Sequence, residues 1–318
     1  MSGEIAGGVT RNVHVAAPAG VVYALMADTS KWPLYFSPNV HVERLEFDGQ
    51  HERIRVWALM DGQLRSWVSA RRLDQVERRI EFRQELPESS LREMLGGAMS
   101  VRSQGPRDTT LELGIDITTF DDPDADRAQA RLAAERSIRT QLRELKSVAE
   151  QWTRLDELTL TFEDSMRIKG APELVYDFLY RADAWPGLVP YVARVDLTEE
   201  APGVQRIAME AVTEYGTHNT ESIRICFPHA GRIICKQTVN PALLAAHTTE
   251  WSVAPDETGV TVTVRHSVVL REEDIAAVLG EGAGLADARR QVREMLGRNS
   301  LTLLTLAKEH AETAVRML

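Results

Sequence analysis

The sequence predicts an α+β protein of two tandem domains, each a curved antiparallel sheet wrapped around a long C-terminal helix. The first observation is an internal repeat, in which the second half follows the first at an offset of 153 positions. The second is that each half has the same order of expected elements. A repeat this long is a whole domain with its own core. The matching residues include Trp32-Pro33 with Trp185-Pro186, Ser69 with Ser222, and Arg71 with Arg224.

The first half begins with an alternating segment, Val9 to Val15, which is typical of a strand. Pro18 is suited to the start of an apolar helix at Ala19–Ala27. Asp28 to Ser30 can cap a second short helix around Trp32. Turn residues such as Asp61-Gly62 then divide six strand-like runs. These runs cover residues 39–48, 51–60, 63–74, 78–86, 95–103 and 109–120.

A long amphipathic helix is expected to close the first half after Pro123, with one apolar stripe facing the core. The stripe consists of Ile138, Leu142, Leu145, Ala149 and Trp152. This order of elements is a helix-grip arrangement. A bent sheet gripping a helix leaves a gap, and polar walls turn such a gap into a ligand cavity.

The second half repeats this order after a domain boundary near residue 155, which gives domains 1–155 and 156–318. Its expected elements are a strand at Leu158–Lys169, a helix at Pro172–Leu179, six strands to about Leu270, a helical insert at Asp274–Leu279 and a helix from about Leu285. The stripe expected on the last helix is Val292, Leu296, Asn299, Leu303, Leu306 and His310.

Composition excludes several classes of partner. The net charge is −10, which argues against nucleic acid because a nucleic-acid partner demands a basic face. No run of eighteen apolar residues could span a membrane, and no signal-peptide pattern occurs, so a cytoplasmic protein is expected. Cys226 and Cys235 could face each other across the turn at Pro228–Gly231, or remain buried free thiols, which we favour.

The run from Leu64 to Leu73 contains the main candidates for chemistry. Alternation places Trp67, Ser69 and Arg71 on one face of a strand. If that face is concave, an aromatic plate, a hydroxyl and a guanidinium line the cavity. A buried arginine is costly unless a partner takes its charge, so Arg71 could instead point to water beside Arg72. Alternation alone leaves both possibilities open.

The second half keeps Ser222 and Arg224, but Thr220 replaces the tryptophan. Ile223 and Ile225 resemble core residues, which would turn Arg224 outward, or they pack against the neighbouring domain.

Several aromatic and sulfur-containing residues have two interpretations. Trp32 and Tyr35 either form the rim of a cavity mouth or close the end of the sheet. Trp57 either stacks on a planar ligand or shields an outer patch, and Met99 is more often a core residue than a functional one. The eight histidines show no metal-ligand spacing, and no phosphate-binding glycine loop or Gly-x-Ser-x-Gly occurs.

The segments Val22–Pro33 and Trp67–Arg71 resemble the polyketide aromatase/cyclases of bacterial type II polyketide synthases, a helix-grip family related to START and birch-pollen-allergen-like proteins. The resemblance covers nearly the whole chain and extends to the di-domain subclass. It implies a poly-β-ketone tethered through phosphopantetheine to an acyl carrier protein, with other synthase subunits as partners. It further implies cyclisation and dehydrative aromatisation of the first ring without a metal or redox cofactor.

The resemblance also implies roles for individual residues. Arg71 matches the family's pocket arginine, and Trp32, Trp67 and Ser69 match wall residues. Asn39 stands where single-domain relatives have a tyrosine, and Tyr35 lies one turn earlier. We therefore expect Arg71 to stabilise an enolate or alkoxide, and Ser69 or Tyr35 to relay a proton. The expected substrate contacts are Trp32, Trp67, Asn39, Trp57 and Met99 in the first half, and Ser222 and Arg224 in the second.

These residues favour catalysis in the first domain, with the second domain supporting it. Two other functions are compatible with the same sequence. A helix-grip domain can carry a polyketide or lipid without turnover, and a duplicated chain can act as a scaffold for synthase subunits. Analysis of the polyketide products separates an enzyme from either alternative.

Overall fold

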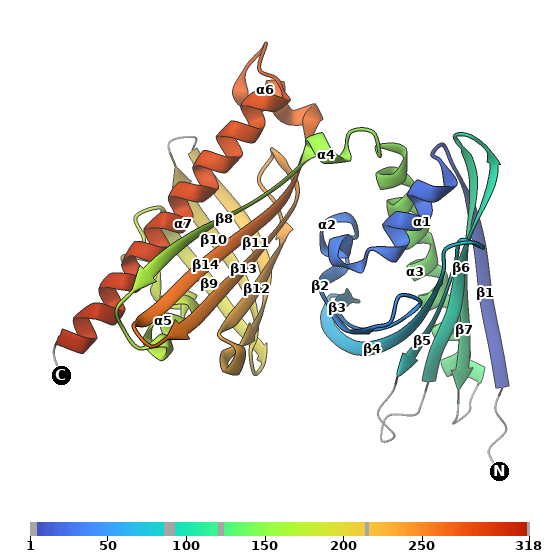
Figure 1. Cartoon of the computed structure of the whole chain (residues 1–318), viewed down its shortest axis with the longest axis horizontal. Coiled ribbons are helices and arrows are strands. Elements are labelled where there is room, and N and C mark those ends of the chain that lie inside the picture. Colours follow the sequence, from blue (N-terminus) through green and yellow to red (C-terminus); the bar gives the residue numbers. More distant parts are fainter. Residues whose placement is uncertain (1–4, 86–92, 120–123, 214–215, 317–318) are drawn as a thin grey trace. The chain divides into compact units, whose positions relative to one another are not determined.

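The computed structural model describes residues 5–85, 93–119, 124–213 and 216–316. The chain divides into two compact units, Met1–Leu155 and Asp156–Leu318. Each unit contains a seven-stranded antiparallel sheet and one long helix (Figure 1). The predicted fold class is confirmed.

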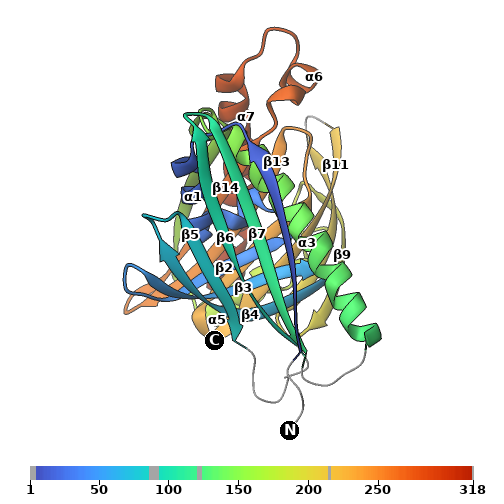
Figure 2. The ribbon, with the colours of Figure 1, turned by 90° about the vertical axis from the view of Figure 1, so that its right-hand side faces the viewer.

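The first unit follows the predicted order of elements closely, and its sheet has the strand order β1-β7-β6-β5-β4-β3-β2. Figure 2 shows α3 running alongside this sheet. The elements are β1 (Ile5–Val15), α1 (Ala19–Ala27), α2 (Trp32–Tyr35), β2 (Asn39–Phe47), β3 (His51–Met60), β4 (Gln63–Asp74), β5 (Arg79–Glu85), β6 (Glu93–Gly105), β7 (Asp108–Thr119) and α3 (Asp124–Glu150).

The β3–β4 hairpin illustrates how local sequence fixes the register of this sheet. Asp61 and Gly62 have φ values of 50° and 79°, which is the conformation of a two-residue type I′ turn. Such a turn pairs residues that lie equally far from it on the two strands. Glu52, nine positions before the turn, is therefore opposite Arg71, nine positions after it.

The core of the first unit lies between the sheet and the helices. Ile138, Leu142, Leu145 and Ala149 of α3 are buried, as the apolar stripe predicts. The prediction that Trp152 belongs to this buried stripe is wrong, because α3 ends at Glu150 and Trp152 is 36% exposed. The period of the stripe continued in the sequence after the helix itself had ended.

The second unit repeats the topology, with the strand order β8-β14-β13-β12-β11-β10-β9. Its elements are α4 (Leu155–Leu158), β8 (Thr159–Ile168), α5 (Pro172–Tyr180), β9 (Val192–Ala201), β10 (Val204–Thr213), β11 (Gly216–Phe227), β12 (Arg232–Val239), β13 (Leu244–Asp256), β14 (Gly259–Leu270), α6 (Ile275–Leu279) and α7 (Leu285–Arg316).

The buried stripe of α7 differs from the prediction in its second half. Val292, Leu296 and Leu303 are buried as expected, but His310 is exposed and Asn299 and Leu306 are only partly buried. Their places are taken by Ser300, Leu304, Ala307 and Ala311. Small residues allow α7 to pack closely against the segment that follows β8. A Cβ added to Gly170 of that segment would lie only 2.8 Å from the Ala311 Cβ of α7. The prediction favoured large side chains and so overlooked the alanines.

No helix in the described ranges is long and apolar enough to cross a membrane. Cys226 and Cys235 are free thiols, as favoured, and the alternative that they face each other across the turn is wrong. The register explains this, because Cys226 lies opposite Ile233 and Cys235 lies opposite Arg224.

Candidate active site

Arg71 lies on the inner face of the first sheet. We define this inner face as the one that carries Glu52, Arg71, Met99 and Leu113 and packs against α1 and α3. The Arg71 residue is 3% exposed, so the alternative that it points to water is wrong. The register also puts Ser69 and Trp67 on this face, opposite Ile54 and Val56 of β3.

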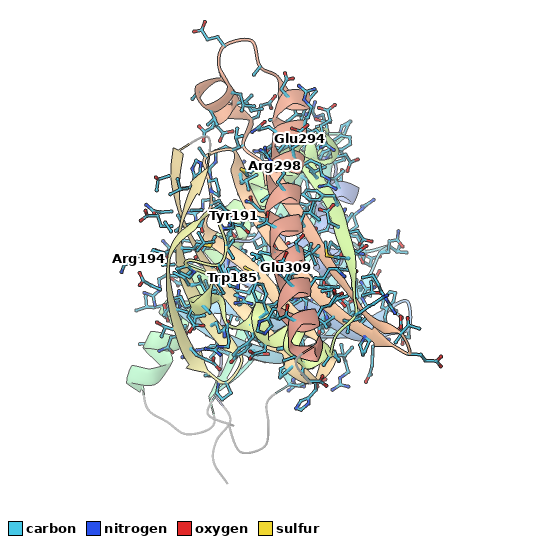
Figure 3. All side chains as sticks on the ribbon, turned by 90° about the vertical axis from the view of Figure 1, so that its left-hand side faces the viewer. Trp185, Tyr191, Arg194, Glu294, Arg298 and Glu309 are labelled. Carbon is cyan, nitrogen blue, oxygen red and sulfur yellow. The ribbon has the colours of Figure 1, made fainter. Side chains whose placement is uncertain are left out.

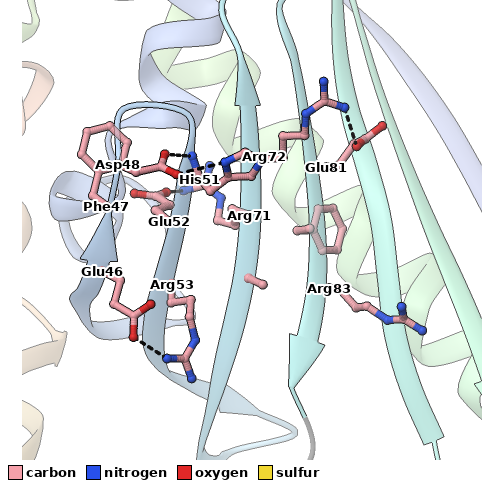
Figure 4. A pocket seen from close by; sticks show the side chains of 12 residues that line it. Glu46, Phe47, Asp48, His51, Glu52, Arg53, Arg71, Arg72, Glu81 and Arg83 are labelled. Atoms are coloured by element: carbon pink, nitrogen blue, oxygen red, sulfur yellow. Dashed lines mark hydrogen bonds and ion pairs between the residues drawn. The ribbon is translucent and has the colours of Figure 1, made fainter.

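The Arg71 guanidinium is held by one carboxylate, one carbonyl and one aromatic ring. Its Nη1 donates to Glu52 Oε1 at 2.5 Å, and its Nη2 donates to the Met26 carbonyl oxygen at 2.7 Å. The guanidinium carbon lies 4.9 Å from the centroid of the Trp32 ring. Burial lowers the pKa of Arg71 to about 10, although the Glu52 carboxylate opposes this shift, so the guanidinium is charged at neutral pH. Figure 4 shows Arg71 beside Glu52.

Two buried N–H groups in this cluster have no acceptor in the described part of the chain. They are Arg71 Nε and Trp32 Nε1. A buried donor without an acceptor costs about 1–3 kcal/mol. Both groups are suited to an oxygen atom of a ligand, because each can donate a hydrogen bond without breaking an existing one.

A small cavity of about 40 Å³ lies beside Trp32, between the sheet and α3. This space suits a few water molecules, whereas a drug-sized ligand occupies several hundred Å³. The lining residues are Met26, Trp32, Phe36, Asn39, Met99, Leu113, Gln141, Leu142 and Leu145. Asn39 and Met99, both predicted substrate contacts, therefore lie together with Trp32.

A larger groove of about 560 Å³ opens to solvent at the Arg71 end of strands β3–β5 (Figure 4). Arg71 and Glu52 belong to its lining, together with charged residues such as Arg53, Arg72 and Arg83. Arg53 is ion-paired with Glu46 and Glu85. The register places Arg53, Arg72 and Arg83 on the face opposite the Arg71 side chain. This groove therefore runs along the outer face of the sheet, and the Arg71 and Glu52 side chains remain buried behind it.

Three further predicted site residues of the first unit, Ser69, Tyr35 and Trp67, are buried or packed against the core. Ser69 is buried, and its hydroxyl lies 3.4 Å from the Arg83 carbonyl oxygen. Tyr35 of α2 is half-buried and packs against the core, and Trp67 packs against Ile54, Val56 and Ala58.

Trp57 lies on the opposite face of the sheet from Arg71. Its ring packs against His41, with 5.1 Å between centroids, and lies 5.9 Å from the Arg55 guanidinium. The outer-face interpretation therefore fits Trp57, and the structure does not bring it together with the Arg71 cluster.

The second unit holds Arg224 in a similar environment. The Arg224 residue is 4% exposed and lies on the inner face of its sheet, which corrects the outward alternative. Its Nη2 donates to the Leu179 carbonyl oxygen, and its Nη1 donates to Gln205 Oε1 at 3.1 Å and the Tyr180 carbonyl oxygen at 3.3 Å. Its guanidinium lies 5.8 Å from the Trp185 ring. Figure 3 labels Trp185 and Tyr191 in the second unit, where the Tyr191 hydroxyl donates to the Asn299 carbonyl oxygen of α7 at 3.2 Å.

A buried histidine pair in the second unit was not predicted from the sequence. His247 Nε2 lies 2.9 Å from His266 Nδ1, and His266 Nε2 lies 2.7 Å from Ser300 Oγ. Burial lowers the pKa of His247 to about 3 and that of His266 to about 4, so both rings are neutral at pH 7. Among the described residues no cluster of three acidic, histidine or cysteine side chains could hold a metal ion.

Glu52 and Gln205 are the other residues that the sequence reasoning missed. A signal for Glu52 was present, because the Asp61-Gly62 turn pairs it with Arg71. For Gln205 a weaker signal existed in the repeat, since it stands 153 positions after Glu52.

Comparison with known proteins agrees with this geometry. The sequence profile described as polyketide cyclase / dehydrase and lipid transport matches residues 7–150 and again 159–304. The chain belongs to this family. Its two matches coincide with the two structural units, and the described residues of each include one buried arginine.

The chain is 38% identical over 317 residues to the actinorhodin polyketide synthase bifunctional cyclase/dehydratase of Streptomyces coelicolor, covering 96% of this chain and 97% of the relative. It is 38% identical over 304 residues to the granaticin bifunctional cyclase/dehydratase of Streptomyces violaceoruber, covering 95% and 93%. The crystal structure of the di-domain ARO/CYC BexL, from the BE-7585A biosynthetic pathway, is 39% identical with a TM-score of 0.86 and coverages of 96% and 99%. The chain is therefore an enzyme of the polyketide cyclase/dehydratase type.

Proposed function

We propose that this polyketide cyclase acts on a poly-β-ketone tethered to an acyl carrier protein, closes its first ring and removes water to make that ring aromatic. The proposal is supported by relatives of 38% identity that are named bifunctional cyclase/dehydratases of polyketide synthases. Other type II synthase subunits are the remaining expected partners. The two free cysteines agree with a reducing cytoplasm as the site of action.

The observation that carries the proposal is the pair of unpartnered donors, Arg71 Nε and Trp32 Nε1, in a buried cluster. In the ring-closing step an enolate carbon bonds to a carbonyl carbon of the same chain. The carbonyl electron pair moves onto its oxygen, which then takes a proton. A buried, charged guanidinium stabilises the negative charge that develops on that oxygen. Loss of the resulting hydroxyl together with a hydrogen from the neighbouring carbon releases water.

Arg71 is better suited to stabilising charge than to donating its own proton, because its pKa remains near 10. Proton transfer therefore falls to a hydroxyl on this side of the unit, and Ser69 and Tyr35 remain our candidates. The shape of the site adds a second contribution. A poly-β-ketone cyclises promiscuously in water, and a cavity that holds one bend of the chain selects one pair of carbons.

Substrate binding requires the cavity beside Trp32 to widen, because 40 Å³ does not accommodate a folded polyketide. Met26 and Met99 both line this cavity. Their unbranched side chains adopt several shapes at low cost, so we propose that they move aside when the chain enters.

The test is product analysis from a minimal synthase with a ketoreductase, with and without this protein. Arg71→Ala is expected to lower the rate of aromatic product formation by about 10²-fold or more, as for the loss of one oxyanion donor. Arg72→Ala is a matched control, because that exposed side chain lies on the other face of the same strand. Near-normal product from Arg71→Ala would contradict the assignment. An unchanged shunt-product pattern with wild-type protein would instead favour a carrier or scaffold.

A further inference from the structure

The cavity beside Trp32 has a polar side chain on its helix side. Of the α3 residues that line it, Leu142 and Leu145 are apolar, whereas Gln141 carries an amide. The Gln141 Nε2 donates to Ser137 Oγ, one turn earlier on α3, at 2.9 Å. This bond fixes the amide, and its Oε1 accepts no hydrogen bond from the described residues. The helix therefore presents an unused acceptor at the cavity.

The same cavity has an unused donor. Trp32 lines it, and the buried Trp32 Nε1 has no acceptor among the residues that the structure describes. A cavity of about 40 Å³ is so small that an oxygen atom inside it lies near both walls. A hydroxyl group can accept from Trp32 and donate to Gln141, whereas a ketone oxygen can only accept.

The second unit shows which residue the same helix position holds in the other copy of the fold. Glu150 of α3 and Glu312 of α7 each accept a hydrogen bond from the first backbone N–H after the opening strand of their unit. Gln141 stands nine residues before Glu150, and Leu303 stands nine residues before Glu312. Leu303 is a buried core residue. The helix-grip fold therefore accepts an apolar side chain at this position.

The donor also differs between the two units. Trp185 repeats Trp32, but its Nε1 donates to the Phe178 carbonyl oxygen at 3.1 Å. In the second unit the indole N–H is thus satisfied within the protein, and a leucine replaces the amide. The unused donor and the unused acceptor occur together in the first unit, and packing of the shared fold does not require either of them.

We propose that Gln141 is a specificity-determining residue whose Oε1 accepts a hydrogen bond from a hydroxyl group of the bound chain, while Trp32 Nε1 donates to the same oxygen. The hydroxyl is the enol of a β-diketone or the alcohol that ring closure forms. Holding one enol in place fixes which carbon is next to it and therefore which ring can close. The identity of the chain as a poly-β-ketone rests on the proposed function, but recognition of a hydroxyl group does not.

The test compares two bicyclic probes that differ in one hydrogen-bond donor. These are 2-naphthol and 2-methoxynaphthalene, titrated into the full-length protein and followed by the fluorescence of the probe. We expect the wild type to bind 2-naphthol about 3- to 10-fold more tightly than the ether, as for one hydrogen bond. Gln141→Met has a similar length without the acceptor, so it should weaken 2-naphthol binding by that factor and leave the ether unchanged. A merely structural role would change both affinities alike.

Gln141→Glu is the matched control, because it keeps an acceptor oxygen at the same place and should retain the preference for 2-naphthol. Arg139→Ala alters an exposed α3 residue and should change neither affinity. Equal binding of the two probes by the wild type, or a preference for 2-naphthol that survives in Gln141→Met, would overturn the proposal.

The synthase assay separates this inference from the proposed function. Gln141→Met should lower the rate of ring closure by about 3- to 10-fold. An active wild type with an equally active Gln141→Met variant would refute the role of Gln141 alone, whereas a wild type that does not change the products would refute the proposed function.

Discussion

The buried Arg71–Glu52 pair allows a quantitative test of how the first unit is held together. Its side chains are 2% and 0% exposed, and Nη1 and Oε1 are 2.5 Å apart. Removing Glu52 leaves the buried Arg71 without a counter-charge, which costs about 3–5 kcal/mol. Removing Arg71 costs less, because Arg44 Nε still donates to Glu52 Oε2 at 3.1 Å. We therefore expect Glu52→Ala to destabilise the unit by about 3–5 kcal/mol, Arg71→Ala to have a smaller effect, and the double variant to cost less than their sum.

The assay is a double-mutant cycle on the full-length protein, followed by hydrogen exchange in β3 and β4 so that the first unit is observed separately. The expected coupling free energy between the two side chains is about 2–4 kcal/mol. The exposed ion pair between Arg72 and Glu81 is the comparison, and its coupling should be only about 0–1 kcal/mol because solvent screens it. If the Glu52→Ala and Arg71→Ala effects add to within about 0.5 kcal/mol, the pair is not a coupled unit and the reasoning fails.

Three further predictions follow from individual contacts. His247 and His266 have pKa values near 3 and 4 in the folded state, against 6.5 in the unfolded state. Their contribution to the free energy of unfolding is therefore complete above about pH 6.5 and is lost as the pH falls toward 4. Denaturant unfolding of the second unit at pH 7 and pH 5 should show a loss of about 2–4 kcal/mol, and an unfolding free energy that does not change with pH would contradict this. Gly97→Ala should destabilise the first unit by about 2–4 kcal/mol, because the added Cβ would lie 2.1 Å from a carbonyl oxygen of β7. Gly96→Ala is the control, since its Cβ would have its nearest contact at 3.5 Å, and thermal unfolding should show a much smaller loss of stability for it. Trp32→Phe removes an unpartnered N–H, so it should leave the melting temperature equal or higher while slowing product formation about tenfold; an equally active variant would remove Trp32 Nε1 from the site.

Local patterns in the sequence were sufficient to predict the helices and strands and part of the candidate active site. The six strand-like runs of the first half coincide closely with β2 to β7, because turn residues and period-two alternation are local properties of the backbone. Alternation also grouped Trp67, Ser69 and Arg71 on one face, and the register confirms that grouping. The internal repeat indicated two domains before any element was assigned.

Alternation along the strands was enough to predict which residues share a face, but it left open which face is inside. That choice depends on contacts between distant segments, such as Arg71 with the Met26 carbonyl oxygen, which lie 45 positions apart. The tertiary structure also decided the small size of the cavity beside Trp32, the pairing of His247 with His266, and the difference between Glu52 and Gln205 as partners of the two arginines. These features arise from the packing of whole elements, and local periodicity carries no information about how a helix and a sheet fill the space between them.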